Sequence, residues 1–283
     1  MLRYYKSWAY KNFLKYDIII NMSNKSKIKI KTEEDIKKLR IAGKRLAFTI
    51  RTVGEHIKEG VSTGELDDVF YNIVKGFGDV PVLLGYQPFG AEYPYPASVC
   101  ISINDEVVHG IPSDERIIKN GDLVKIDGCL AHDGMIADHA ITVPCGTITE
   151  AEEQLLADTK EARAAGIKAA RAGAVVLDIS RAVEKSINSK KKNYGIVKIL
   201  SGHGVGYAVH EEPYVPNYDD GSKNVKLVPG MVLAIEPMVN LGTDDCVLLE
   251  DGYTFITEDG KKSAHFEHTV LITENGPEIL TVE

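Results

Sequence analysis

The sequence carries one pattern twice: a long helix and a shorter helix separated by a glycine, with 113 residues between the copies. Gly60 marks the break in the first copy and Gly173 marks it in the second. In each copy, strand-like runs with Gly and Pro turns follow the second helix. The pattern therefore favours two related α+β halves, with strand-rich layers that meet under a shell of helices. A single domain of this kind fits a chain of 283 residues.

The helix boundaries come from capping patterns and apolar spacing. Ser or Thr followed three residues later by an acidic residue is typical of a helix start, and glycine is typical of its end. The expected helices run from Thr32 to about Lys58, from Ser62 or Thr63 to Gly76 or Gly78, from Thr149 to before Gly173, and from Val176 or Asp178 onward.

Charge divides the chain into a basic extension, residues 1–31, and an acidic body, residues 32–283. The extension holds eight basic residues against Asp17 alone, whereas the body has a net charge of −15. An acidic body argues against nucleic acid as the main ligand and suits the binding of metal cations and ammonium groups. We expect the extension to be a disordered arm, or the product of a start assigned too early with Met22 as the initiator. A mitochondrial-type presequence is the alternative.

Cysteine usage and hydropathy bear on location. The four cysteines show no CxxC spacing and no density typical of a disulfide scaffold. No apolar run approaches the roughly 18 to 20 residues that span a bilayer. We therefore expect a soluble, cytoplasmic protein without a membrane partner.

Two aspartates lie on a predicted β-hairpin. The runs 122–127 and 136–143 flank a turn signal at 131–134. A loop at His132 and Asp133 would place Asp127 directly opposite Asp138, whereas a loop at Asp133 and Gly134 would place them on the same face but diagonally. Either way the carboxylates lie roughly 5 to 8 Å apart and repel each other unless a proton or a cation intervenes. An edge hairpin with solvated acids is the plainer alternative.

Three further side chains of metal-binding type lie in the second half. Glu236 and Glu267 occupy apolar, strand-like runs, where an unpaired carboxylate is costly to bury, and glycines flank His203. Singly, each is more often a core or turn residue than a ligand. Together, four carboxylates and one imidazole without a thiolate suit a pair of hard to borderline divalent ions. The glycines at 202, 204 and 206 also permit a nucleotide-binding loop, but no helix signal follows them.

As a set these motifs resemble type 1 methionine aminopeptidases over about residues 32–283. The resemblance rests on the segments 125–128, 137–140, 202–206, 235–240 and 266–269. It implies the pita-bread fold, with two pseudo-symmetric halves, antiparallel strands inside and helices outside. It also implies two divalent ions, Co, Mn, Fe or Zn. The implied ligands are Asp127, Asp138, His203, Glu236 and Glu267.

The resemblance further implies hydrolysis of the peptide bond after an initiator methionine, with a small second residue preferred. Glu236 would move the proton, His210 would contact the carbonyl oxygen, and His109 would lie near the departing nitrogen. The implied methionine slot comprises Tyr86, Tyr95, Cys100 and Tyr253. The expected partners are the N-termini of nascent polypeptides and, transiently, the ribosome, with the enzyme a monomer.

Several positions depart from the common bacterial pattern. Tyr253 replaces a usual tryptophan, His139 replaces a frequent threonine, and the loop 87–93 is several residues longer. These departures affect the slot and not the ligands. Two alternatives remain: a proline-specific aminopeptidase on the same fold, and a non-catalytic binding homologue, which would be expected to lose ligands.

Overall fold

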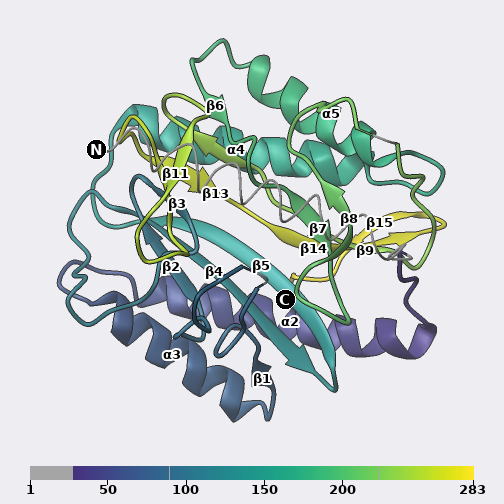
Figure 1. Ribbon diagram of the computed structural model, residues 1–283, viewed down its shortest axis with the longest axis horizontal. Coiled ribbons are helices and arrows are strands. Elements are labelled where there is room, and N and C mark those ends of the chain that lie inside the picture. The colour runs from purple at the N-terminus through teal and green to yellow at the C-terminus, as the bar shows by residue number, and fades with distance from the viewer. Residues whose placement is uncertain (1–27, 89, 223) are drawn as a thin grey trace.

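The computed structural model describes residues 28–88, 90–222 and 224–283, and in that part of the chain four helices enclose layers of β-strands (Figure 1). Helices α2 and α3 cover one side of the strands, and α4 and α5 cover the other. The α+β class with helices outside is therefore confirmed. The helices are α2 (Glu33–Glu55), α3 (Thr63–Gly76), α4 (Glu150–Ala169) and α5 (Val176–Asn188).

The helices begin where the capping patterns predicted. Thr32 caps α2, and its side chain accepts a hydrogen bond from the Asp35 N–H at 3.2 Å, while the Asp35 carboxylate accepts one from the Thr32 N–H at 2.9 Å. The expected end of α2 near Lys58 was wrong by three residues. The last N–H groups bond only three residues back, with His56 donating to the Val53 carbonyl, so the final turn tightens and the helix ends.

Two larger sheets contain most of the strands. The first has the order β1–β4–β2, with β5 paired to β4, and the second has the order β15–β14–β9–β7–β8. The first comprises β1 (Val80–Pro81), β2 (Cys100–Ile103), β4 (Leu123–His132) and β5 (Met135–Pro144). The second comprises β7 (Gly202–Gly204), β8 (Glu211–Val215), β9 (Val232–Ile235), β14 (His268–Thr273) and β15 (Gly276–Ile279).

Two smaller sheets of three strands complete the strand layers. One has the order β13–β10–β6 and the other β11–β12–β3. Their strands are β3 (Glu106–Val108), β6 (Gly195–Ile196), β10 (Met238–Asn240), β11 (Cys246–Leu248), β12 (Phe255–Thr257) and β13 (Ser263–His265).

The internal repeat is visible in the backbone at the two glycine breaks. Gly60 has φ 89° and donates its N–H to the Ile118 carbonyl at 2.9 Å. Gly173 has φ 88° and makes the same bond to Leu227, also at 2.9 Å. Such positive φ values favour glycine, so the two breaks have one physical cause. The predicted division into two related halves is confirmed.

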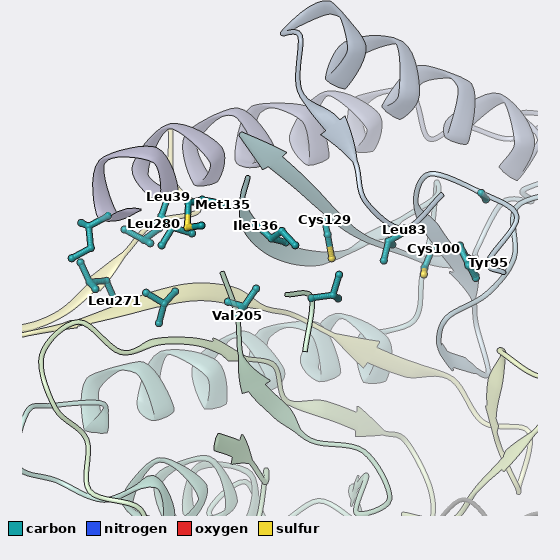
Figure 2. Packing of buried hydrophobic residues seen from close by; sticks show 14 of the residues in the cluster. Leu39, Leu83, Tyr95, Cys100, Cys129, Met135, Ile136, Val205, Leu271 and Leu280 are labelled. Carbon is teal, nitrogen blue, oxygen red and sulfur yellow. The ribbon is translucent and has the colours of Figure 1, made fainter. Parts of the chain in front are cut away.

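A buried hydrophobic cluster joins the halves (Figure 2). Leu39 of α2 and Ile136 of β5 come from the first half, and Val205 and Leu271 come from the second. The same cluster includes Cys129 of β4, and Figure 2 shows it continuing to Cys100 and Tyr95, two of the residues predicted to bind methionine. Burial of this apolar surface stabilises the interface between the halves, where the candidate site lies.

Among the helices of the described residues, none combines the length and the apolar character that a transmembrane span needs. The basic extension falls largely outside the described residues. Of its last members, Lys31 is buried, and its N–H donates to the Gly230 carbonyl at 2.9 Å.

Candidate metal centre

The β4–β5 hairpin decides between the two registers left open by the sequence. Asp133 and Gly134 have φ values of 47° and 80°. A two-residue type I′ hairpin turn requires positive φ at both of its central residues. The resulting register pairs Cys129 with Asp138 and Asp127 with Ala140. Direct pairing of the two aspartates is therefore wrong, and they lie diagonally on the same face of the hairpin.

Three predicted ligands converge from different parts of the fold. One ligand atom each of Asp138, His203 and Glu267 lies within 4.8 Å of the others, and all three side chains are buried. Asp138 belongs to β5, His203 to β7, and Glu267 directly precedes β14. The group therefore forms only when the two halves meet.

Backbone and hydroxyl hydrogen bonds hold this junction. The Glu267 N–H donates to the Ala140 carbonyl at 2.9 Å. The Thr269 hydroxyl donates to the Asp138 carbonyl at 2.7 Å and accepts the Asp138 N–H at 2.9 Å. These bonds join β5 to the segment 267–269, and they fix the positions of the Asp138 and Glu267 carboxylates relative to each other. This part of the site is therefore preformed.

His203 and Glu236 complete one side of the cluster. His203 Nε2 lies 3.3 Å from Glu236 Oε1 and 3.9 Å from Asp138 Oδ2. The other ring nitrogen, Nδ1, lies 3.0 Å from the Gly204 carbonyl oxygen, which can only accept, so Nδ1 carries the hydrogen in that bond. Nε2 is then free to act as a ligand when the ring is neutral.

The carboxylates are too crowded to be ionised together without a cation. Burial, and then the charges of Asp138 and Glu236, raises the pKa of Asp127 well above its usual value. Burial and the same two charges also raise the pKa of Glu267. Buried oxygens Asp138 Oδ1 and Glu267 Oε1 have no hydrogen-bond partner among the described residues. Orphaned acceptors and repelling charges both fit divalent cations, whose preferred ligands are oxygen and imidazole nitrogen.

His210 and His109, the two histidines expected to contact the substrate, lie beside this cluster. Burial most of all lowers the pKa of His210 to about 3 and that of His109 to about 4. The His210 ring lies edge-on to His203 with centroids 4.5 Å apart, and its Nδ1 is 3.0 Å from the Tyr86 hydroxyl. Both rings are thus neutral near pH 7, and each can hydrogen bond to a substrate without adding charge.

The residues predicted for the methionine slot gather in the cluster that joins the halves. Tyr95, Cys100 and Tyr253 are buried members, and Tyr86 packs against them. The rings of Tyr95 and Tyr253 are edge-on at 5.1 Å, and Cys100 pairs with Asp127 on the neighbouring strand. Aromatic and sulfur-bearing groups therefore lie directly beside the candidate metal ligands.

Two residues at the site were missed from the sequence. His265 is buried, and its Nε2 lies 3.4 Å from Glu236 Oε2, while neither ring nitrogen has a hydrogen-bond partner among the described residues. Arg163 of α4 donates to the Glu267 carbonyl at 3.2 Å. The alternation of a strand gives the signal for His265, because residues two apart, here His265 and Glu267, face the same side. No sequence signal distinguishes Arg163 from other basic residues of its helix.

Comparison with known proteins assigns this arrangement to a family. Residues 37–274, more than four fifths of the chain, match the sequence model of metallopeptidase family M24. The chain belongs to metallopeptidase family M24. As in any metallopeptidase, a divalent metal is part of its chemistry, and the buried carboxylate and imidazole cluster described above is its candidate centre.

Methionine aminopeptidases are among the proteins that this chain resembles. A methionine aminopeptidase from Aquifex aeolicus is 45% identical over 258 residues, covering 90% of this chain and 98% of that protein. The crystal structure of a methionine aminopeptidase from Thermotoga maritima superposes with a TM-score of 0.85 at 38% identity, covering 91% of this chain and all of that one. The resemblance and the pita-bread fold expected from the sequence are thereby confirmed.

A prolidase from Pyrococcus furiosus shares the fold of this M24 chain less closely. Its TM-score is 0.69 at 27% identity, and the match covers 90% of this chain but only 65% of the prolidase. The chain is thus more similar to the methionine aminopeptidases than to this proline-processing relative.

Proposed function

We propose that this protein removes the initiator methionine from new polypeptides and prefers a small second residue. The observation that carries the proposal is the buried group of Asp138, His203 and Glu267, assembled between the halves of a chain that is 45% identical to a methionine aminopeptidase. The neighbouring cluster of apolar, aromatic and sulfur-bearing side chains supplies a slot for a thioether, which packs well against aromatic rings.

The ligand set suits two divalent ions, with Co, Mn, Fe and Zn as candidates. The residues that would hold them are Asp127, Asp138, His203, Glu236 and Glu267. The four carboxylates of this set carry four negative charges, which would balance the charge of two divalent ions. Bound divalent ions supply Lewis acidity and lower the pKa of water near the scissile carbonyl.

The protein's own residues carry the proton and orient the substrate. Glu236 accepts a proton from the attacking water and delivers it to the leaving amine, as a carboxylate in this position can. His210 stabilises the carbonyl oxygen as negative charge develops there, and the Tyr86 hydroxyl fixes the orientation of its ring. His109 lies close enough to Glu236 for the charge of that carboxylate to act on the His109 pKa. His109 assists at the departing nitrogen.

The free N-terminal amine of the substrate explains an exopeptidase activity. The body of the protein is acidic, with a net charge of −15 over residues 32–283, and the site itself is rich in carboxylates. An ammonium group is attracted to such a site, whereas an internal peptide bond carries no such charge at this position. Nascent polypeptides in the cytoplasm are the natural substrates, met at a transient contact with the ribosome by a monomeric enzyme.

Peptide hydrolysis tests the proposal directly. Metal-stripped protein is given Mn, Fe, Co or Zn and offered Met-Ala-Ser, Met-Leu-Ser, Leu-Ala-Ser and Ala-Pro-Ser. We expect metal-dependent release of methionine from Met-Ala-Ser alone. Cleavage of Ala-Pro-Ser instead would place the enzyme in the proline-specific branch. No cleavage with any metal, despite bound metal by elemental analysis, would favour a binding homologue.

A further inference from the structure

A buried ion pair lies behind the loop that carries His210, outside the candidate metal centre. The His210 loop, residues 205–210, connects β7 to β8, and Glu211 is the first residue of β8. Lys31 Nζ lies 2.6 Å from Glu211 Oε2, and the two side chains are only 1% and 4% exposed. In a desolvated pair of this kind, each charge would be costly to bury without the other.

The Glu211 carboxylate closes the His210 loop on itself. Its second oxygen, Oε1, accepts the N–H groups of Tyr207 at 2.6 Å and Ala208 at 2.9 Å. These two donors lie three and two residues before His210, so their positions constrain the path of the chain that leads to it. The carboxylate thus uses one oxygen to shape the loop and the other to bind Lys31.

Lys31 anchors this loop to the rest of the fold. Its N–H donates to the Gly230 carbonyl at 2.9 Å, just before β9. A Cβ on Gly206 would lie 2.4 Å from Lys31 Cε, which shows how closely the lysine stem packs on the loop. The ammonium also lies 5.0 Å from the centre of the Tyr207 ring, whose hydroxyl donates to Asp35 at 2.5 Å.

We propose that Lys31 is a positioning residue for His210, acting through Glu211 and the His210 loop. The ring of His210 needs a defined place because it lies between His203, at 4.5 Å between centroids, and the Tyr86 hydroxyl, 3.0 Å from Nδ1. The pair holds the backbone of the loop, and Tyr86 holds the tip of the ring. This inference rests on the role of His210 in the proposed function.

A double-mutant cycle with His210→Ala separates positioning from general stability. Full-length Lys31→Met is expected to lower kcat for Met-Ala-Ser about tenfold, with KM and metal content within twofold of the parent. In the His210→Ala background the same change is expected to alter kcat by less than twofold, because the group that it positions is gone. A tenfold loss in both backgrounds would overturn the proposal, since Lys31 would then act on the fold and not on His210.

Matched variants keep the test decisive. Arg40→Met removes an exposed ion pair between α2 and β15, at 2.7 Å from Glu278, and should leave kcat unchanged. Lys31→Arg retains the charge and should restore at least a third of the lost kcat. If Lys31→Met does not fold, the double variant Lys31→Met/Glu211→Leu replaces the ion pair with apolar groups. It also removes the carboxylate that accepts the N–H groups of Tyr207 and Ala208. That double variant should fold and give the same cycle result.

A readout independent of turnover distinguishes this inference from the proposed function. Histidine ring resonances of the metal-free protein, assigned with His210→Ala, report the environment of His210. Lys31→Met should shift the His210 signals, whereas Arg40→Met should not. If the parent protein cleaves no methionyl peptide but this shift occurs, the proposed function fails and the positioning stands. An unshifted His210 signal in Lys31→Met would overturn the positioning alone.

Discussion

The two halves of the molecule share a backbone frame but place different side chains on it. In the first half, Gly121 donates its N–H to the Cys145 carbonyl at 2.7 Å, and in the second, Gly230 donates to Ile272 at 2.9 Å. Both glycines have positive φ, 92° and 87°, and each lies two residues before the strand that leads to the site. The frame therefore permits a comparison residue by residue.

Aligned on these bonds, Asp127 corresponds to Glu236, since both lie six residues after the glycine. On the partner strand, the pairing of Cys129 with Asp138 corresponds to that of Met238 with His265. Glu267 then corresponds to Ala140. Each half thus supplies one carboxylate at the shared position and a second at a position where the other half has none. The fold repeats, but the ligand set is divided between the halves.

The frame itself is interrupted in one half only. The first half has a continuous hairpin, β4 and β5, whereas the matching segment of the second half is split into β9 with β10 and β13 with β14. Pro237 stands at the break and has no N–H to donate to a neighbouring strand. At the break, the backbone bonds to other segments: the Glu267 N–H donates to the Ala140 carbonyl of the first half's hairpin at 2.9 Å, and the Glu236 carbonyl accepts from the Asn217 side chain at 3.2 Å.

The largest effect is expected where one half supplies a ligand that the other lacks. Glu267→Gln keeps the shape of the side chain but removes its charge. We expect kcat/KM for Met-Ala-Ser to fall at least about a thousandfold, because several kcal/mol of transition-state stabilisation depend on the bound metal. Elemental analysis should show less bound metal. The exposed Glu274→Gln is the control on the same side of the fold, and equal losses in both variants would contradict the assignment.

The same variant should stabilise the metal-free protein. Burial and the neighbouring charges raise the pKa of Glu267 well above its usual 4.5, so the folded state holds this proton more tightly than the unfolded chain. The ionised group therefore costs folding free energy as pH rises above 4.5. Urea unfolding of Glu267→Gln against the parent should show a stability advantage at pH 8 that shrinks towards pH 4.5. An advantage independent of pH would show that charge is not its cause.

A smaller effect is expected at His265, which corresponds to Asp138 in the first half. His265→Leu removes the ring nitrogen that lies 3.4 Å from Glu236 Oε2 and leaves the five proposed ligands in place. We expect kcat to fall about tenfold to a hundredfold, as for other residues that contact metal ligands, with metal content retained. His56→Leu, on the exposed end of α2, is the control. Loss of metal from His265→Leu would instead make His265 a ligand itself.

The same residues show which features of the fold and the site can be predicted from the sequence. Local patterns were sufficient where the cause is local: Thr32 and Asp35 cap α2 as expected, and the Asp133-Gly134 turn determines the hairpin register. The sequence left that register open because two turns of equal length were compatible with it. It could not reveal the correspondence of His265 to Asp138, because that depends on how strands distant in sequence pair, and the Lys31–Glu211 contact joins residues 180 apart.

The smallest effect tests whether the frame is truly shared. Gly60→Ala and Gly173→Ala each place a Cβ at φ near 89°, with no atom within 4 Å to clash. The cost is therefore purely conformational, about 1–2 kcal/mol of unfolding free energy, and should be equal in the two halves. Gly76→Ala also meets no atom within 4 Å but lies in α3, so it should cost nothing. Urea unfolding measures all three. A difference of more than about 1 kcal/mol between Gly60→Ala and Gly173→Ala would mean that the two breaks are strained differently, since neither local φ nor packing distinguishes them.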